Sequence, residues 1–333
     1  MYLTLHFPVT VYIDIQDRRF RSIPTTQYLF LILPMETMDP EPSLSSPSLP
    51  SSRWWSRETV VAVTGANKGI GFALVKRFAE LGLTVILTAR DYERGKKAVE
   101  SLWALGFNNV HFSLLDVSDQ ASIKDFTSWF TQRFQALDVL VNNAAVSFNE
   151  LHENSVDYAE TVLRTNFYGP KLLTEALLPF FRHSSASKCR ILNISSRLGH
   201  INKLRNPGIK QVLVDEENLS EEQVEKMVSL FLESVKRGTW KSQGWPQVWT
   251  DYAVSKLALN AYSKVLARRF QGSNLSVNCF CPGFTQTSMT RGMGTRTADE
   301  AAETAATIAL LPSHQLPTGK FYMTRTALTC SNL

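Results

Sequence analysis

Cysteine is scarce in this chain, and long apolar segments and runs of basic residues are missing. The 333 residues include six histidines, which show no metal-ligand spacing, and four cysteines, which form no CxxC pair. No apolar run reaches the roughly 18 residues that a membrane span needs, and no Lys/Arg run typical of nucleic-acid binding occurs. We therefore expect no metal site, no membrane span and no nucleic-acid partner. The cysteines are Cys189, Cys279, Cys281 and Cys330, and we expect them to be reduced.

The composition is that of a folded globular protein. Hydrophobic residues make up 44% and charged residues 20%, which excludes a wholly disordered or fibrous chain. Lys and Arg number 35 against 30 Asp and Glu, a net charge of +5, which suits a protein that handles anionic ligands. The length allows either two small domains or one large α/β domain.

Residues 1–58 lack helix or strand periodicity, and their last part is rich in Ser and Pro. We interpret them as a disordered N-terminal extension. A targeting peptide is one alternative, against which the acidic residues Asp14 and Asp17 argue. Another is an over-extended reading frame whose working start is Met35 or Met38. Without a convincing signal we expect a cytoplasmic protein, with a plastid location as the alternative.

From Thr59 onward, short apolar and β-branched runs alternate with helical stretches. The runs are Thr59–Thr64, Thr84–Thr88, His111–Leu115, Val139–Val141, Arg190–Ile194, Ser276–Phe280 and Lys320–Met323. Such alternation is typical of βαβ units, which build a parallel sheet with helices on both faces. We predict an α/β, doubly wound domain over residues 59–323, followed by a tail at 324–333.

A helical insert at about residues 200–250 interrupts this alternation. Ser220 and Gln223 form a capping box, apolar residues repeat at helical spacing, and Gly238 stands at the expected C-terminal cap. The tryptophans that follow this helix are Trp240, Trp245 and Trp249. They form either a packing cluster that seals the insert or an aromatic wall over a substrate pocket.

A glycine-rich loop with the spacing GxxxGxG joins the first strand to a helix. Its candidate binding residues are Gly65, Asn67, Lys68, Gly69, Ile70 and Gly71. Glycines remove Cβ atoms where backbone must approach a pyrophosphate, and the helix N-terminus offers unpaired N–H donors. This strand–loop–helix context predicts a dinucleotide site.

The end of the second strand indicates which dinucleotide is bound. Ala89 and Arg90 stand where an NAD-preferring site places an acid against the ribose 2′-hydroxyl. Together with Lys68, Arg90 supplies a second cation for a 2′-phosphate, so we predict NADP(H). The alternative is that both are solvated surface charges, and the neighbouring Asp91 weakens the inference.

Tyr252 and Lys256 lie four residues apart on a predicted helix, and so share one face. A neighbouring ammonium favours the phenolate and lowers the pKa of a tyrosine, as acid–base catalysis requires. Ser195 and Ser196 end a strand at the carboxyl edge of the predicted sheet, where ligands bind in such folds. Serine in that position is also common as a helix cap or turn residue.

Together these motifs resemble those of the short-chain dehydrogenase/reductase family. In order along the chain they are TGANKGIG, Leu115-Asp116-Val117, Asn142-Asn143-Ala144-Ala145, Asn166 in NFYG, Ser195-Ser196, YAVSK and Pro282-Gly283. The sequences GANKGIG and LTARD and the helical insert look like the carbonyl reductase branch, in particular plant menthone (neomenthol dehydrogenase-like) and salutaridine reductases. The resemblance implies a Rossmann-type, seven-stranded parallel sheet with a helical insert before the catalytic tyrosine.

The resemblance also implies a catalytic tetrad of Asn166, Ser196, Tyr252 and Lys256. Tyr252 would protonate the carbonyl oxygen, and Ser196 would hydrogen-bond it. Lys256 would lower the pKa of Tyr252 and hold the nicotinamide ribose. Asn166 would anchor a water that links Lys256 to solvent.

Further cofactor contacts follow from the same resemblance. Asp116 and Val117 match the adenine-binding step, and Asn143 and Ala144 match a segment that lines the cofactor. Pro282, Gly283 and Thr287 match the segment that closes over the nicotinamide amide. Two features depart from the family pattern, namely Ala145 in place of glycine and a tail without the expected apolar ending.

The implied activity is NADPH-dependent reduction of a small apolar ketone or aldehyde. One alternative is an NAD(P)-linked alcohol dehydrogenase that works in the oxidative direction. Another is a nucleotide-binding pseudoenzyme or scaffold, which Ala145 and the tail suggest. Related reductases with this insert are usually monomers, because the extra helices cover the surface used for oligomerisation, so we expect a monomer.

Overall fold

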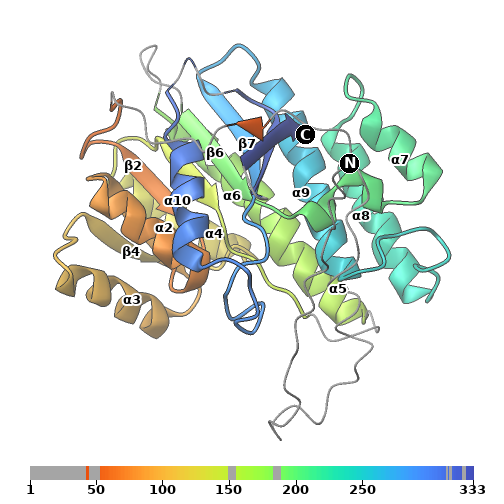
Figure 1. Ribbon diagram of the computed structural model, residues 1–333, viewed down its shortest axis with the longest axis horizontal. Coiled ribbons are helices and arrows are strands. Elements are labelled where there is room, and N and C mark those ends of the chain that lie inside the picture. The colour runs from red at the N-terminus through yellow and green to blue at the C-terminus, as the bar shows by residue number, and fades with distance from the viewer. Residues whose placement is uncertain are drawn as a thin grey trace, which may run out of the picture. The chain divides into compact units, whose positions relative to one another are not determined.

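The computed structural model describes residues 43–44, 53–148, 155–182, 189–312, 314, 317–324 and 328–333, all within one compact unit, Glu41–Leu333. The strands of this unit are β1 (Ser43–Leu44), β2 (Val60–Val63), β3 (Thr84–Ala89), β4 (Val110–Leu114), β5 (Val139–Asn142), β6 (Cys189–Ile194), β7 (Leu275–Cys281), β8 (Lys320–Thr324) and β9 (Leu328–Asn332). They form a single sheet in the order β1-β9-β8-β7-β6-β5-β2-β3-β4 (Figure 1).

The strands β2 to β8 are parallel to one another, so the predicted seven-stranded parallel sheet is confirmed. β9 and β1 are additional and run antiparallel, and β9 lies in the tail. Tyr322 pairs with Cys330, and Leu333 packs on the group that contains Phe321 and Met323. The tail, which lacks an obvious apolar pattern, therefore extends the sheet beyond β8, and β9 lies between β8 and the two-residue strand β1.

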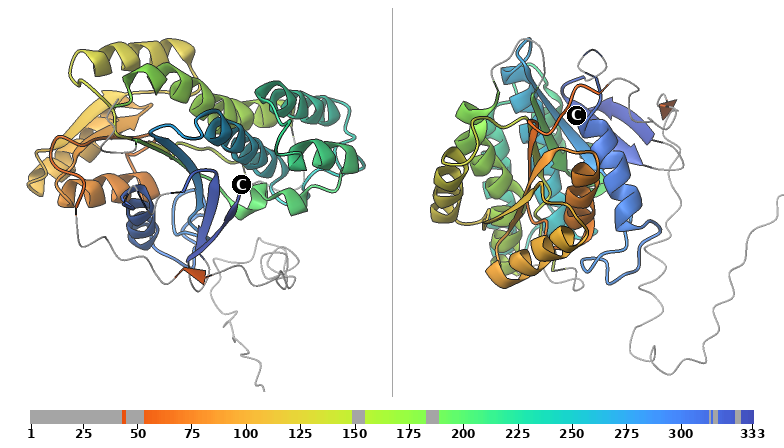
Figure 2. Two further views of the ribbon diagram at one scale, coloured as in Figure 1. Left: turned by 90° about the horizontal axis from the view of Figure 1, so that it is seen from above. Right: turned by 90° about the vertical axis from the view of Figure 1, so that its left-hand side faces the viewer.

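Helices cover both faces of the sheet, as the sequence predicts (Figure 2). One face carries α2 (Gly69–Glu80), α3 (Tyr92–Ala104) and α10 (Ala298–Ala309), and the other carries α4 (Gln120–Thr131), α5 (Val156–Leu163), α6 (Gly169–Leu177) and α9 (Thr250–Arg269). The apolar runs are buried on both sides, and every residue of β2, β5, β6 and β7 is buried. Continuous apolar strands are stable here because helices remove both faces from water.

The insert consists of α7 (Pro207–Val214) and α8 (Glu221–Lys236). The predicted capping box at Ser220 is present, and Gly238 after the helix has φ +68°. α8 packs against α5 and α9, and Lys171 of α6 joins it through ion pairs with Glu221 (3.0 Å) and Glu225 (2.6 Å). The insert is therefore attached to the helical layer next to α9.

Most of residues 1–58 lie outside the described residues, but residues 53–58 are packed against the domain. The Trp54 indole donates a hydrogen bond to the Leu310 carbonyl (3.0 Å), and Trp55, 5% exposed, donates to the Leu81 carbonyl (3.3 Å). The Arg190 guanidinium lies 3.6 Å from the centre of the Trp54 ring. The packed chain thus starts earlier than the predicted boundary at Thr59. Among the described residues, no helix is long and apolar enough to cross a membrane.

Candidate active site

The strand order changes direction between β2 and β5, and this is where the sequence-predicted residues gather. From β2 the chain builds outward through β3 and β4, and from β5 it builds the other way through β6, β7 and β8. In open parallel sheets, ligands bind at such a switch point, outside the carboxyl ends of the strands. The loops after β2, β5 and β6 start at this edge.

The glycine loop after β2 is joined to the segment after β5 by close contact and by hydrogen bonds. Gly65 has φ +62°, and a Cβ there would lie 2.8 Å from the Ala144 Cα. The Thr64 hydroxyl accepts the N–H groups of Asn143 and Ala144, both at 2.9 Å. The Asn143 side chain donates to the carbonyls of Thr64 (2.8 Å) and Gly65 (3.2 Å). The predicted residues Gly65, Asn143 and Ala144 therefore form one interlocked unit.

The N-terminus of α2 fits an anionic group. Its cap residue, Lys68, makes no side-chain capping bond, and its first turn holds no acidic residue. Gly69 has φ +57°, and a Cβ there would lie 3.5 Å from Thr287 Cγ2, which places Thr287 opposite the loop. Asn67 and Ile70 are half-buried on either side. Free helix N–H groups and a glycine-lined approach are what a pyrophosphate requires, so these residues fit a dinucleotide.

Two cations flank this loop. Lys68 and Arg90 are exposed, and neither side chain forms a hydrogen bond or ion pair with a described residue. The Ala66 N–H donates to the Thr88 carbonyl (2.8 Å), which holds the loop against the end of β3 just before Arg90. Asp91 caps α3, since its side chain accepts the Arg94 N–H (2.9 Å). The acid that weakened the inference of NADP is thus engaged in a helix cap.

The predicted adenine-binding residues lie after β4. The Asp116 carboxylate accepts both the N–H (2.9 Å) and the hydroxyl (2.7 Å) of Ser118. Val117 is 5% exposed and its backbone carbonyl packs closely on Gly169, where a Cβ would lie 2.8 Å from it. The Val117 side chain therefore belongs to the core, and Asp116 shapes the turn.

The segment after β7 folds back on itself. Pro282 is buried, and Gly283 has φ +79°. The Thr287 N–H donates to the Thr290 hydroxyl (3.0 Å), and the Gln286 N–H donates to the Arg296 carbonyl (2.7 Å). These bonds hold Thr287 in the position opposite Gly69.

Tyr252 lies in the first turn of α9 and is 9% exposed. Burial raises the pKa of its phenol above the ordinary value, and the nearby Ser196 hydroxyl opposes this rise. We expected Lys256 to lower this pKa. In the protein alone the pKa of Tyr252 is instead raised, because desolvation of the phenolate outweighs the lowering effect of the Ser196 hydrogen bond, and Lys256 is not among the groups that shift it. The phenol therefore carries its proton throughout the neutral pH range.

Lys256 lies one turn further along α9 and is 2% exposed. Its ammonium donates to the Ile194 carbonyl (2.8 Å) and lies 5.6 Å from the centre of the Tyr252 ring. Burial lowers the pKa of Lys256 to about 8. The bond to Ile194 attaches α9 to the end of β6, two residues before Ser196, so Ser196, Tyr252 and Lys256 are brought together.

Asn166 is fully buried on a π-helix, η3 (Arg164–Tyr168). Its carboxamide accepts the Val146 N–H (2.8 Å) and donates to the Val146 carbonyl (2.9 Å) and the Ser255 hydroxyl (3.1 Å). π-Helical turns frequently occur at functional sites. The Asn166 side chain holds the segment after β5 to α9, and its role as a water anchor stays a prediction.

Thr64 and Asp251 were not predicted as site residues, and the structure gives specific partners to them and to Ser195 and Trp249. Thr64 bridges the two cofactor loops, and the Ser195 hydroxyl donates to Asn260 (2.6 Å) on α9. Asp251 accepts the Tyr252 N–H (2.7 Å), and Trp249 contacts the Tyr252 ring edge to face. The sequence left Trp249 with two interpretations, and its spacing of three residues from Tyr252 is the signal that could have indicated this contact.

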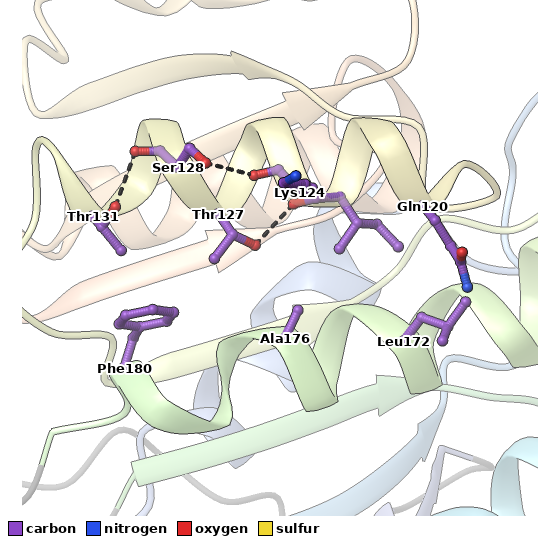
Figure 3. Close-up of a pocket in the computed structure, with 9 residues that line it drawn as sticks. Gln120, Lys124, Thr127, Ser128, Thr131, Leu172, Ala176 and Phe180 are labelled. Atoms are coloured by element: carbon purple, nitrogen blue, oxygen red, sulfur yellow. Dashed lines mark hydrogen bonds between the residues drawn. The ribbon is translucent and has the colours of Figure 1, made fainter.

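A cavity of about 430 Å³ lies elsewhere, between α4 and α6 (Figure 3). It is lined by Ile123, Leu172, Ala176 and Phe180 and by polar residues of α4. None of the predicted site residues lines it. The strand ends, rather than this cavity, hold the candidate chemistry.

Comparison with known proteins identifies related chains. The short chain dehydrogenase profile matches residues 59–208, and an enoyl-(acyl carrier protein) reductase profile matches residues 238–312. The chain is 35% identical over 282 residues to (+)-neomenthol dehydrogenase of Arabidopsis thaliana, covering 78% of this chain and 94% of that protein. It is 34% identical over 274 residues to mouse carbonyl reductase [NADPH] 1, covering 80% and 96%. The structure of Papaver somniferum salutaridine reductase matches with a TM-score of 0.73 and 34% identity, covering 79% and 99%.

Proposed function

Because this chain belongs to the short-chain dehydrogenase/reductase family, we propose that it reduces an apolar ketone or aldehyde to the alcohol with NADPH. The observation that carries this proposal is the cluster of Ser196, Tyr252 and Lys256 where β6 ends and α9 begins. It places a protonated phenol, a hydroxyl and a buried ammonium at the sheet edge where such folds bind ligands.

The chain's own groups divide the chemistry among them. When bound, the nicotinamide would supply a hydride to the carbonyl carbon. The Tyr252 phenol, whose pKa burial raises, holds the proton that the carbonyl oxygen needs. The Ser196 hydroxyl orients that oxygen, and Lys256, fixed on the Ile194 carbonyl, holds the nicotinamide ribose. Asn166 keeps the segment after β5 against α9.

The preference for NADPH rests on Lys68 and Arg90. Both are free to pair with a 2′-phosphate, and Asp91 is engaged in capping α3. The name of the mouse relative, carbonyl reductase [NADPH] 1, supports the same cofactor. Each lost charge-assisted bond to a phosphate costs about 1.5 kcal/mol or more.

The test is steady-state oxidation of NADPH and NADH by the purified chain with a panel of cyclic ketones and aldehydes. We expect turnover that favours NADPH, and a Tyr252→Phe variant that binds NADPH but does not turn over. Lys68→Ala combined with Arg90→Ala should raise the KM for NADPH by more than about tenfold while leaving NADH unchanged. Lys96→Ala, an exposed cation on α3, is the matched control. NADPH binding without turnover of any carbonyl would favour the pseudoenzyme.

We further propose that the protein is a monomer located in the cytoplasm. α8 covers α5 and α9 and is held to α6 by the ion pairs of Lys171, so the insert occupies this helical surface. Light scattering that shows a stable tetramer would contradict the monomer. A fluorescent fusion at the C-terminus distinguishes cytosol from plastid.

A further inference from the structure

Trp249 has an unusual backbone for a large aromatic residue. It lies at the N-cap of α9 with φ 49° and ψ 53°, in the left-handed region. Among the described non-glycine residues, only Arg291 shares a positive φ. This conformation costs a bulky residue about 1 kcal/mol or more, so the surrounding structure must impose it.

The chain that leaves the insert is anchored at Gly244 and Trp245, shortly before Trp249. Trp245 is fully buried and packs edge to face on Phe231 of α8, with ring centres 5.2 Å apart. The Gly244 carbonyl accepts the N–H groups of Arg205 (2.8 Å) and Asn206 (3.2 Å). The chain is thus fixed just before Trp249. Trp245 therefore fits the packing interpretation of the tryptophans, whereas Trp249 has a different environment.

The Trp249 ring is directed at the catalytic tyrosine. Its centre lies 5.9 Å from that of Tyr252, and the two ring planes are inclined at 79°. The ring does not cap the helix, since Trp249 makes no side-chain capping bond and the Asp251 carboxylate accepts the Tyr252 N–H instead. Trp249 stays half-exposed. The insert therefore presents a partly open aromatic surface next to the proton donor.

We propose that Trp249 is a specificity-determining residue that selects apolar cyclic ketones over short linear carbonyl compounds. The proposal rests on the proposed reductase function. The rings of Trp249 and Tyr252 are nearly perpendicular and together form an apolar surface at the proposed proton donor. A cyclic ketone buries a ring face against the indole while its oxygen reaches Tyr252, whereas a short linear aldehyde buries little surface there.

The test separates the ring from the strained backbone. Trp249→Gly removes the ring and relieves the left-handed strain, whereas Trp249→Ala removes the ring and keeps the strain. Trp103→Ala, which removes an indole from the remote helix α3, is the control. Kinetic constants are measured for menthone and for butanal, together with NADPH affinity, and calorimetry measures menthone binding to the NADP⁺-loaded protein.

In both Trp249 variants, kcat/KM for menthone should fall about tenfold relative to kcat/KM for butanal, which is typical of the loss of one apolar pocket contact. The loss should come mainly from a higher KM for menthone. The NADPH affinity of both variants should match wild type, and menthone binding should weaken. An equal loss for both substrates would overturn the proposal, because the ring would then only position Tyr252. A loss confined to Trp249→Ala would also overturn it. If wild type turns over no carbonyl compound, the proposed reductase function is refuted. The role of Trp249 is then decided by calorimetry alone, through the comparison of menthone binding to wild type and to the two Trp249 variants.

Discussion

Replacing Gly71 by alanine sets two physical effects against each other. Gly71 lies in the first turn of α2 and has no positive φ, so helix propensity alone favours alanine by about 1 kcal/mol. Sterics oppose it, because the new Cβ would lie 2.4 Å from Asn143 Nδ2, 2.8 Å from the Gly65 carbonyl oxygen and 2.9 Å from the Ala66 Cα. Two of these three neighbours are backbone atoms, which cannot move aside cheaply.

The cost can be worked out from these contacts. Displacing the Asn143 side chain breaks its bonds to the Thr64 and Gly65 carbonyls, each worth about 1 kcal/mol net. Overpacking against backbone adds about 1 kcal/mol or more. After subtraction of the helix gain, Gly71→Ala should destabilise the protein by about 2 kcal/mol, which lowers Tm by roughly 4–8 °C. Because the same groups hold the cofactor loop, NADPH affinity should also fall.

The assay is thermal unfolding followed by circular dichroism, with NADPH affinity measured by fluorescence. Gly208→Ala in α7 is the matched control, because the nearest atom to its new Cβ is 3.7 Å away. That variant should be neutral or more stable. A Gly71→Ala protein that is as stable as wild type and binds NADPH equally well would refute the steric argument.

Two further predictions concern buried cations. Burial lowers the pKa of Lys256 to about 8 from 10.5 when exposed, so folding is opposed by the cost of burying the ammonium. As pH rises from about 8 towards 10.5, the folded protein loses this proton before the unfolded chain does, and the free energy of unfolding increases. Thermal unfolding measured at several pH values should therefore show the Tm of wild type rising relative to that of Lys256→Met between pH 8 and 10.5. A relative fall in Tm over this range would contradict the predicted direction of the pKa shift. Trp54→Ala removes the ring over Arg190 and the bond to Leu310, and should cost about 3 kcal/mol. Trp103→Ala, at a residue that is 45% exposed, should lower Tm less in the same thermal assay. A Trp54→Ala protein with the Tm of wild type would show that the Trp54 segment does not stabilise the domain.

The sequence predicted the elements whose signals are local. The seven parallel strands lie within a residue or two of the apolar runs, because a strand buried on both faces must be continuously apolar. The capping box at Ser220 predicted the start of α8, since its two hydrogen bonds involve residues only three apart. By contrast, β9 has the sequence LTCSN, and its pairing with β8 depends on the free edge of a sheet already formed. No local pattern encodes that edge.

The candidate site divides in the same way. The glycine loop, the Tyr252–Lys256 pair and Ser196 could be identified because each lies next to a strand end or on one helix face. The direction of the pKa shift of Tyr252 could not be predicted, because it depends on how far the surrounding elements exclude water from the phenol. Desolvation is the largest cause of this shift and exceeds the effect of any nearby charge. The positive φ of Trp249 could not be predicted either, because no local sequence signal marks a tryptophan in that conformation. Motifs thus predict which groups gather at this edge of the sheet, whereas burial, which no motif encodes, sets the direction of the pKa shift of Tyr252.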